Sequence, residues 1–246
     1  MNKQLKSYSV KSSNKPRLVG VILAASAESS RGFTAPLMLL DGRTVLEHVL
    51  GRCTAIAGPA SVILSVPDSE HSEPLMRIAD KLTIRSATDD DASLVTRVYN
   101  VAKYFKLDLI MYVKDNQPLV DPTICKEVLD LAMWRKTDYC SNIFPTRTYP
   151  KGLDCEVFTF DCLEWAAINA TTKEALEDFT APMQKHPDIR RALVSQKVNR
   201  SKDDWSVNSL ADLVRVSDVI DKAKTRKKND AARILANQKR LSNEGN

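Results

Sequence analysis

Three residues that could bind an anion follow the first strongly apolar segment of the chain. The segment RLVGVILAA spans residues 17–25, and Ser29, Ser30 and Arg31 come shortly after it. Hydroxyl groups and backbone amides can surround phosphate oxygens, and a guanidinium group can bind two of these oxygens at once. The pattern therefore predicts a phosphate site. The tripeptide Ser-Ser-Arg also occurs in ordinary solvated turns, and that interpretation stays open.

Carboxylate and amide side chains follow a second apolar segment, DLIMYV at residues 108–113. Asp115 and Asn116 come directly after it, and Asn208 precedes a predicted helix. Oxygen ligands of this kind can hold a Mg²⁺ ion against a nucleotide phosphate. The alternatives are a surface turn at Asp115, a local backbone cap at Asn116 and a helix N-cap at Asn208.

Strands that alternate with helices must position these residues. The continuous apolar segments at residues 17–25, 61–66 and 108–113 are typical of strands buried on both faces, with a further strand predicted at 82–86. Helices are predicted between them and from about Ser209 to the C-terminal region. This rhythm predicts an α/β fold with a doubly wound, mostly parallel sheet, in which ligands bind at the carboxyl ends of the strands.

Smaller features divide the chain into three parts. Residues 1–16 are polar and basic and are predicted to be a disordered tail, residues 17–220 to form one domain, and residues 221–246 to form a basic helix or tail. Strands at 139–144 and 152–160 bracket a turn-rich segment, which predicts a small β insertion at about 138–160, and a further short strand is predicted at 205–207.

Composition restricts the partners. The net charge of +5 comes mainly from the two ends, and without interleaved aromatic residues it does not indicate nucleic-acid binding. No apolar run is long enough to span a membrane, and the first residues do not resemble a secretory signal, so a cytoplasmic protein is expected. Five scattered cysteines and three histidines do not form a zinc pattern, and the cysteines are expected to be buried thiols.

Five segments together resemble a known family. They are VILAASAESSRGFTAPLMLLDGRTVLEHVL, VKDNQPLVDP, SNIFPTRTYPKGLDCEVFTFDCLE, EDFTAP and WSVNSLADLVRV, within residues 17–217. They are similar to the acylneuraminate and 3-deoxy-octulosonate cytidylyltransferases, and especially to the spore coat polysaccharide biosynthesis protein F group. The resemblance implies a nucleotide-diphosphosugar transferase fold, transfer of CMP from CTP to an acidic sugar for surface-glycan biosynthesis, Mg²⁺ as cofactor, and a homodimer.

The resemblance also implies roles for single residues. Nucleotide binding would fall on the first loop, and sugar binding on the insertion. The implied nucleotide-binding residues are Ala24, Ala25, Ser29, Ser30 and Arg31, and the implied sugar-binding residues are Arg147, Tyr149, Asp154 and Glu156.

The chain departs from the family pattern where charge is needed. Ser26 and Ala35 stand at the positions of a basic residue and a lysine, while Asn116 and Asn208 stand at those of the metal-binding carboxylates. Two hypotheses follow. In the first, the chain is an active enzyme in which Arg31 binds phosphate and Asp115 helps to hold magnesium together with the two asparagines. In the second, it is a catalytically impaired homologue that acts as a binding or scaffolding subunit.

Overall fold

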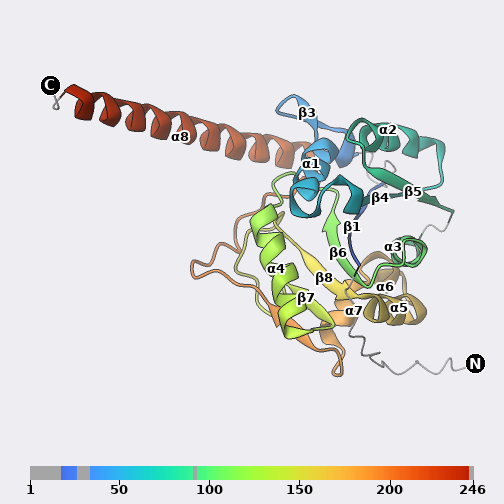
Figure 1. Cartoon of the computed structure of the whole chain (residues 1–246). Helices are drawn as coiled ribbons and strands as arrows, with labels where there is room; N and C mark the ends of the chain where they lie inside the picture. Colours follow the sequence, from blue (N-terminus) through green and yellow to red (C-terminus); the bar gives the residue numbers. More distant parts are fainter. Residues whose placement is uncertain (1–17, 27–33, 91–92, 244–246) are drawn as a thin grey trace, which may run out of the picture.

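The computed structural model describes residues 18–26, 34–90 and 93–243. Its centre is a seven-stranded sheet with the order β5-β4-β1-β6-β8-β7-β9 (Figure 1). The strands are β1 (Val19–Ala24), β4 (Val62–Pro67), β5 (Arg85–Asp89), β6 (Leu109–Lys114), β7 (Tyr139–Ser141), β8 (Glu156–Thr159) and β9 (Arg191–Leu193). β8 pairs antiparallel with β6 and β7, and the other pairs are parallel. The predicted mostly parallel sheet is confirmed.

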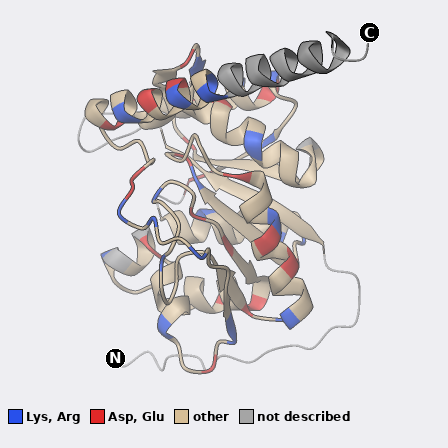
Figure 2. Ribbon diagram, turned by 90° about the vertical axis from the view of Figure 1, so that its left-hand side faces the viewer, with Lys and Arg blue, Asp and Glu red and all other residues tan. Residues whose placement is uncertain are grey.

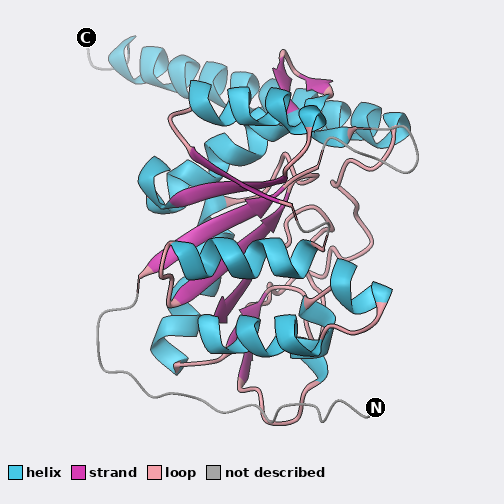
Figure 3. Ribbon diagram, turned by 90° about the vertical axis from the view of Figure 1, so that its right-hand side faces the viewer, coloured by secondary structure: helices cyan, strands magenta, loops and turns pink. Residues whose placement is uncertain are grey.

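Helices cover both faces of this sheet, and Figure 3 shows the layers from the side. One hydrophobic core lies under α1 (Val45–Ala57), α2 (Glu73–Lys81) and α4 (Pro122–Arg135). A second core lies under α3 (Leu94–Tyr104), α5 (Phe160–Asn169), α6 (Lys173–Glu177) and α7 (Thr180–Lys185). Successive residues of β1 alternate between the two cores because strand side chains point to opposite faces. Burial on both faces explains why the sequences of β1, β4 and β6 are almost continuously apolar.

Local signals set the helix starts. Thr44 and Glu47 form a reciprocal capping box at α1, in which the Thr44 amide donates to Glu47 Oε2 at 2.7 Å and the Glu47 amide donates to Thr44 Oγ1 at 3.1 Å. Asp121 caps α4, whose first residue is Pro122. The short elements are a small hairpin of β2 (Leu39–Leu40) and β3 (Arg43–Thr44) and the 3-10 helices η1 (Ala35–Leu37), η2 (Pro59–Ser61) and η3 (Glu70–Ser72).

The predicted insertion strands join the main sheet. β7 and β8 pair with each other, as a hairpin would, and β8 also pairs with β6, so residues 139–159 extend the central sheet. The strand predicted at 205–207 is wrong: residues 205–207 form no strand, and the neighbouring Asp204 makes an isolated bridge with Lys151. Gly152, at φ +87°, allows this approach, because a Cβ atom there would lie 2.4 Å from the Trp205 carbonyl carbon.

The last helix, α8 (Leu210–Asn243), begins beside α1 and leads away from the sheet (Figure 1). Leu213, Val216 and Ile220 pack against the first core, and Lys224 forms an ion pair with Asp41 in the β2–β3 turn. Acidic and basic residues both occur along the described part of this helix (Figure 2). The tail predicted at 1–16 lies outside the described residues, and the division of the chain at residue 220 stays a prediction.

The structure bears on two expectations from composition, the burial of the cysteines and the lack of a membrane-spanning helix. All five cysteines are buried, as expected. Between residues 18 and 243, leaving aside the undescribed gaps, no helix combines the length and the apolar character that a membrane span requires.

Candidate functional site

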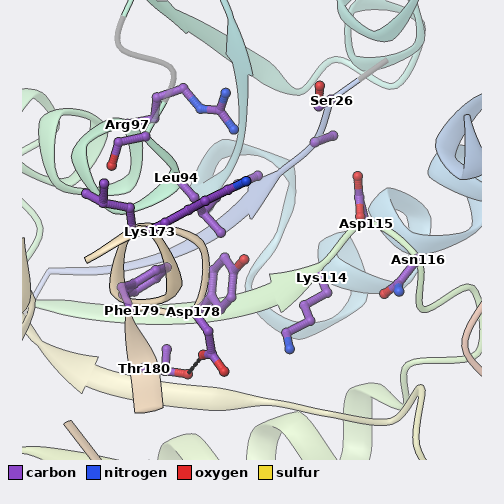
Figure 4. A pocket seen from close by; sticks show the side chains of 15 residues that line it. Ser26, Leu94, Arg97, Lys114, Asp115, Asn116, Lys173, Asp178, Phe179 and Thr180 are labelled. Atoms are coloured by element: carbon purple, nitrogen blue, oxygen red, sulfur yellow. Dashed lines mark hydrogen bonds between the residues drawn. The ribbon is translucent and has the colours of Figure 1, made fainter. Parts of the chain in front are cut away.

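The order in which the strands are added to the sheet reverses between β1 and β6. From β1 the chain moves outward to β4 and β5, and it then returns to place β6 on the other side of β1. At such a switch point the loops after neighbouring parallel strands separate and leave a crevice. A cavity of about 710 Å³ lies there, lined by the ends of β1 and β6, the start of α3 and residues 173–180 (Figure 4).

Three cationic side chains line this cavity. Lys114 is the last residue of β6, Arg97 comes from the second turn of α3, and Lys173 begins α6. Figure 4 shows Lys173 extended across the cavity and the guanidinium group of Arg97 on its wall. Arg97 is only 6% exposed. Because solvent screens a buried charge poorly, Arg97 can attract an anionic ligand strongly.

Asp115 turns toward β1. Its side chain points to Ser26 in Figure 4 and accepts a hydrogen bond from the Ser26 backbone. Burial raises the pKa of Asp115 to about 6, and the Ser26 hydrogen bond and the charges of Arg97 and Lys114 limit the rise. Asp115 thus holds the loop ends of β1 and β6 together.

The segment after α6 forms the opposite wall. Asp178 accepts a hydrogen bond from Thr180 Oγ1 at 3.1 Å, and both line the cavity. Phe179 is buried edge-on against Tyr112 and Phe158, with ring centroids 5.2 and 5.9 Å apart. This aromatic anchor fixes the polar side chains on either side of it.

Asn116 and Asn208 contact each other directly. Asn116 Nδ2 donates to Asn208 Oδ1 at 2.7 Å, although the two residues lie 92 positions apart. Asn208 Nδ2 in turn donates to Ser206 Oγ at 3.0 Å. Asn116 Oδ1 is buried, and no described residue donates a hydrogen bond to it. The N-cap interpretation of Asn208 is wrong, because Ser209 Oγ accepts from the Asp212 amide in the first turn of α8.

This set of donors does not fit Mg²⁺. The ion prefers carboxylate oxygens in octahedral geometry, but Asn116 and Asn208 are neutral and already bonded to each other. Asp115, the nearest carboxylate in sequence, points toward Ser26 instead (Figure 4). Within the described ranges no group of three or more His, Cys, Asp or Glu residues is placed to hold a metal ion.

Comparisons with known proteins support the fold. No protein-family model matches the chain. An uncharacterized protein of Methanocaldococcus jannaschii is 25% identical over 173 residues, which are 70% of this chain and 69% of that protein. The 8-amino-3,8-dideoxy-manno-octulosonate cytidylyltransferase of a Shewanella species is 26% identical over 114 residues, 45% of this chain and 46% of that enzyme.

A solved cytidylyltransferase structure from Leptospira borgpetersenii has a TM-score of 0.76 and 19% identity, covering 85% of this chain and 96% of that one. The fold is that of the nucleotide-diphosphosugar transferases, as the resemblance predicts. The chain spans less than half the length of the Shewanella enzyme it matches, and the particular likeness to the spore coat F group stays a prediction.

The structure places part of the predicted nucleotide site on this cavity. Ala24 and Ala25 line it, together with Asp115 and Asn116. Ala35 begins η1 and packs against the first hydrophobic core. The predicted phosphate-binding residues Ser29, Ser30 and Arg31 lie outside the described residues.

None of the predicted sugar-binding residues lines the cavity, and two of them, Arg147 and Asp154, pair with each other. Arg147 binds both carboxylate oxygens of Asp154. Tyr149 is buried. Glu156, 1% exposed, accepts hydrogen bonds from Tyr139 Oη at 2.5 Å and from Gln184 Nε2 at 3.3 Å.

Glu156 lies behind the cavity wall. The charge of Lys114 and a hydrogen bond with Thr180 both act to lower its pKa, and these two residues line the cavity. Burial outweighs them, so the pKa of Glu156 is raised.

Arg97 and Lys173 were not among the residues predicted from the sequence. A signal for Arg97 was present, because it falls on the apolar face of its helix with Leu94, Val98 and Val101. A charged residue on a buried helix face needs a polar neighbour, and here it faces a cavity. Lys173 carried no comparable signal, since it begins a short helix as an ordinary surface lysine would.

Proposed function

We propose that this protein binds a cytidine nucleotide in the cavity over β1 and β6 and activates an acidic sugar as its CMP-sugar for surface-glycan biosynthesis. One observation carries the proposal: Arg97, Lys114 and Lys173 line a cavity at the strand-order switch of this fold. Similarity to cytidylyltransferases supports the choice of reaction. The finer likeness to the spore coat F group and the homodimer belong to the same proposal.

The proposed chemistry places negative charge where the cations lie. A hydroxyl group of the sugar attacks the α-phosphorus of CTP, the new phosphoester bond forms, and the bond to pyrophosphate breaks. Negative charge spreads over the phosphate oxygens in the transition state, and fixed cations stabilise it. Lys114 and Arg97 would supply this stabilisation from opposite walls, and Lys173 would reach the ligand across the opening.

The acidic sugar would bind toward β8. Asp154 and Glu156 come from the segment that the resemblance links with the sugar, and Glu156 lies directly behind Lys114 and Thr180. In the structure Arg147 neutralises Asp154. A sugar carboxylate would therefore contact Lys114 more readily than Arg147, because Lys114 lines the cavity.

One observation favours a second candidate function. The amide pair of Asn116 and Asn208 stands where the resemblance implies metal-binding carboxylates, and Ala35 stands where it implies a lysine. Loss of charged groups at a reacting centre lowers a rate steeply, since each 1.4 kcal/mol of lost stabilisation costs about tenfold. The second candidate is a homologue that binds nucleotide and sugar but transfers CMP slowly or not at all.

A pyrophosphate-release assay tests the proposal. CTP is mixed with a panel of nonulosonic and octulosonic acids, in parallel with and without Mg²⁺. Release that depends on one sugar supports the enzyme, and its rate should fall at least tenfold in Lys114→Met. Lys126→Met, on the exposed side of α4, is the matched control and should keep the full rate.

CTP binding without any turnover would support the second candidate. Absence of both binding and turnover, with every nucleotide tried, would contradict both functions.

A further inference from the structure

We propose that this site binds its cytidine nucleotide without a divalent cation, the Asn116–Asn208 amide pair standing in place of a metal-binding carboxylate pair. The inference rests on the proposed function, because it concerns the nucleotide in that same cavity. This cation-free binding differs from the expectation set by the resemblance, which implies Mg²⁺ as a cofactor.

The contact between the two asparagines is one that two carboxylates could not make. Asn116 Nδ2 and Asn208 Oδ1 are 2.7 Å apart, and an N–H donor faces an oxygen acceptor. Two ionised carboxylates at this separation repel each other unless a proton or a cation lies between them. Two neutral amides do not repel each other and can form this hydrogen bond directly, although Asn116 Oδ1 stays without a described donor. The pair therefore closes without any ion.

The surrounding chain fixes the pair in this closed arrangement. The Val207 amide donates to the Asn116 carbonyl at 2.9 Å, which brings the strand end and the segment before α8 together. Asn208 Nδ2 donates to Ser206 Oγ at 3.0 Å, and Ser206 Oγ donates to Asp204 at 2.6 Å. A metal ion placed between the two asparagines would have to break their hydrogen bond. It would gain no negatively charged ligand in exchange, because both side chains are neutral amides.

Side-chain cations can take over the charge balance. The described residues around the cavity include the cations Arg97, Lys114 and Lys173 and the carboxylates Asp115 and Asp178. When all five are ionised, these residues carry one net positive charge. In a metal-dependent site the ion offsets part of the phosphate charge, whereas here the lysines and the arginine do so from fixed positions. A divalent cation in solution would then change nucleotide affinity little.

Titration calorimetry with the full-length chain tests the inference. CTP is titrated once in a chelating buffer and once with millimolar Mg²⁺, at the same ionic strength. The expected result is binding in both, with Kd values within about twofold. Binding more than tenfold tighter with Mg²⁺ would overturn the inference and leave the proposed function standing. No binding in either buffer would instead count against the proposed function.

Two variants sharpen the test. Asn116→Asp combined with Asn208→Asp creates the repelling carboxylate pair, so CTP affinity should fall at least tenfold in chelator and recover with Mg²⁺. Asn199→Asp adds a negative charge on an exposed loop, where its oxygen can still accept from the Ser201 amide at 2.9 Å, and should behave as the unmodified chain. An equal loss of affinity in both variants would contradict the specific role of the pair.

Discussion

The cavity over β1 and β6 and the segment 138–156 use charged residues in opposite ways. Around the cavity, Arg97, Lys114 and Lys173 line a space that a ligand can enter. In the segment 138–156, Arg147 is bound to Asp154, and Asp138, with a fully buried side chain, is bound to Arg190. The first arrangement can neutralise a bound anion, and the second mainly holds the chain together. A charged residue in a segment that resembles a known family therefore need not contact the ligand.

The strongest way to test this contrast is to remove a structural carboxylate. Asp138→Ala breaks hydrogen bonds from the Arg190 backbone amide at 3.0 Å and from its guanidinium group. We expect the free energy of unfolding to fall by about 3 kcal/mol, because breaking a buried ion pair leaves polar groups without partners. Urea denaturation followed by circular dichroism measures this loss.

The nucleotide affinity of the folded Asp138→Ala variant should stay within twofold. Asp130→Ala, on the exposed side of α4, is the control and should lose less than about 0.5 kcal/mol. If the Asp138→Ala variant kept its stability but bound CTP poorly, Asp138 would act in ligand binding and not in holding the chain together.

The pair of Arg147 and Asp154 should give a smaller effect of the same kind. Their side chains are 23% and 12% exposed, so solvent can reach the charge that is left behind. Arg147→Ala is expected to cost about 2 kcal/mol of unfolding free energy. If Arg147 instead contacts the sugar, the free energy of unfolding of the variant should stay unchanged and its KM for the sugar should rise.

On the cavity side, Lys114→Met should weaken binding and spare stability. Removal of a cation next to a phosphate is expected to raise the Kd for CTP about tenfold, or about 1.4 kcal/mol. The thermal midpoint should change little, because Lys114 is half-buried at a strand end. Titration calorimetry measures the Kd for CTP and scanning calorimetry the thermal midpoint, each with Lys126→Met as the control. An unchanged Kd would show that Lys114 does not face the ligand.

The smallest expected effect is a pH dependence at Glu156. Burial raises the pKa of Glu156 in the folded protein, so the folded state favours the protonated form more than the unfolded state does. Its contribution to stability is present below the ordinary value of 4.5 and is lost as the pH rises through the raised pKa. Glu156→Gln removes this titration and keeps an acceptor for Tyr139.

The unfolding free energy of Glu156→Gln, measured relative to the unmodified chain, should therefore increase from pH 4 to pH 8. A constant difference across this range would show that Glu156 does not titrate differently on folding.

Much of the fold was predictable from local pattern. Continuous apolar segments predicted β1, β4 and β6, because strands covered on both faces have no solvent-facing positions. Predicted ends were less accurate: β5 was expected at 82–86 and lies at Arg85–Asp89. Residues 205–207 were predicted to be a strand from their β-branched and aromatic content, but they form none; only the neighbouring Asp204 makes a bridge, with Lys151.

The location of the site was predictable from the sequence, but only some of the residues that line it were. The rule that ligands bind at the carboxyl ends of parallel strands led to Asp115, and the resemblance led to Ala24 and Ala25; all three line the cavity. It could not find Lys173, because a lysine at the start of a short helix has no distinctive local environment. The same limit applies to the insertion, where sequence spacing did not reveal that Arg147 and Asp154 bind each other.

By itself, the sequence determined the layers of this protein and the strand ends where a ligand could bind, since hydrophobic periodicity is a local property of the chain. Only the tertiary structure decided which polar groups meet. Asn116 and Asn208 are 92 residues apart, and their hydrogen bond exists because the segment before α8 returns to the end of β6. Charge balance and hydrogen bonding depend on distances of a few ångströms, and the fold sets those distances.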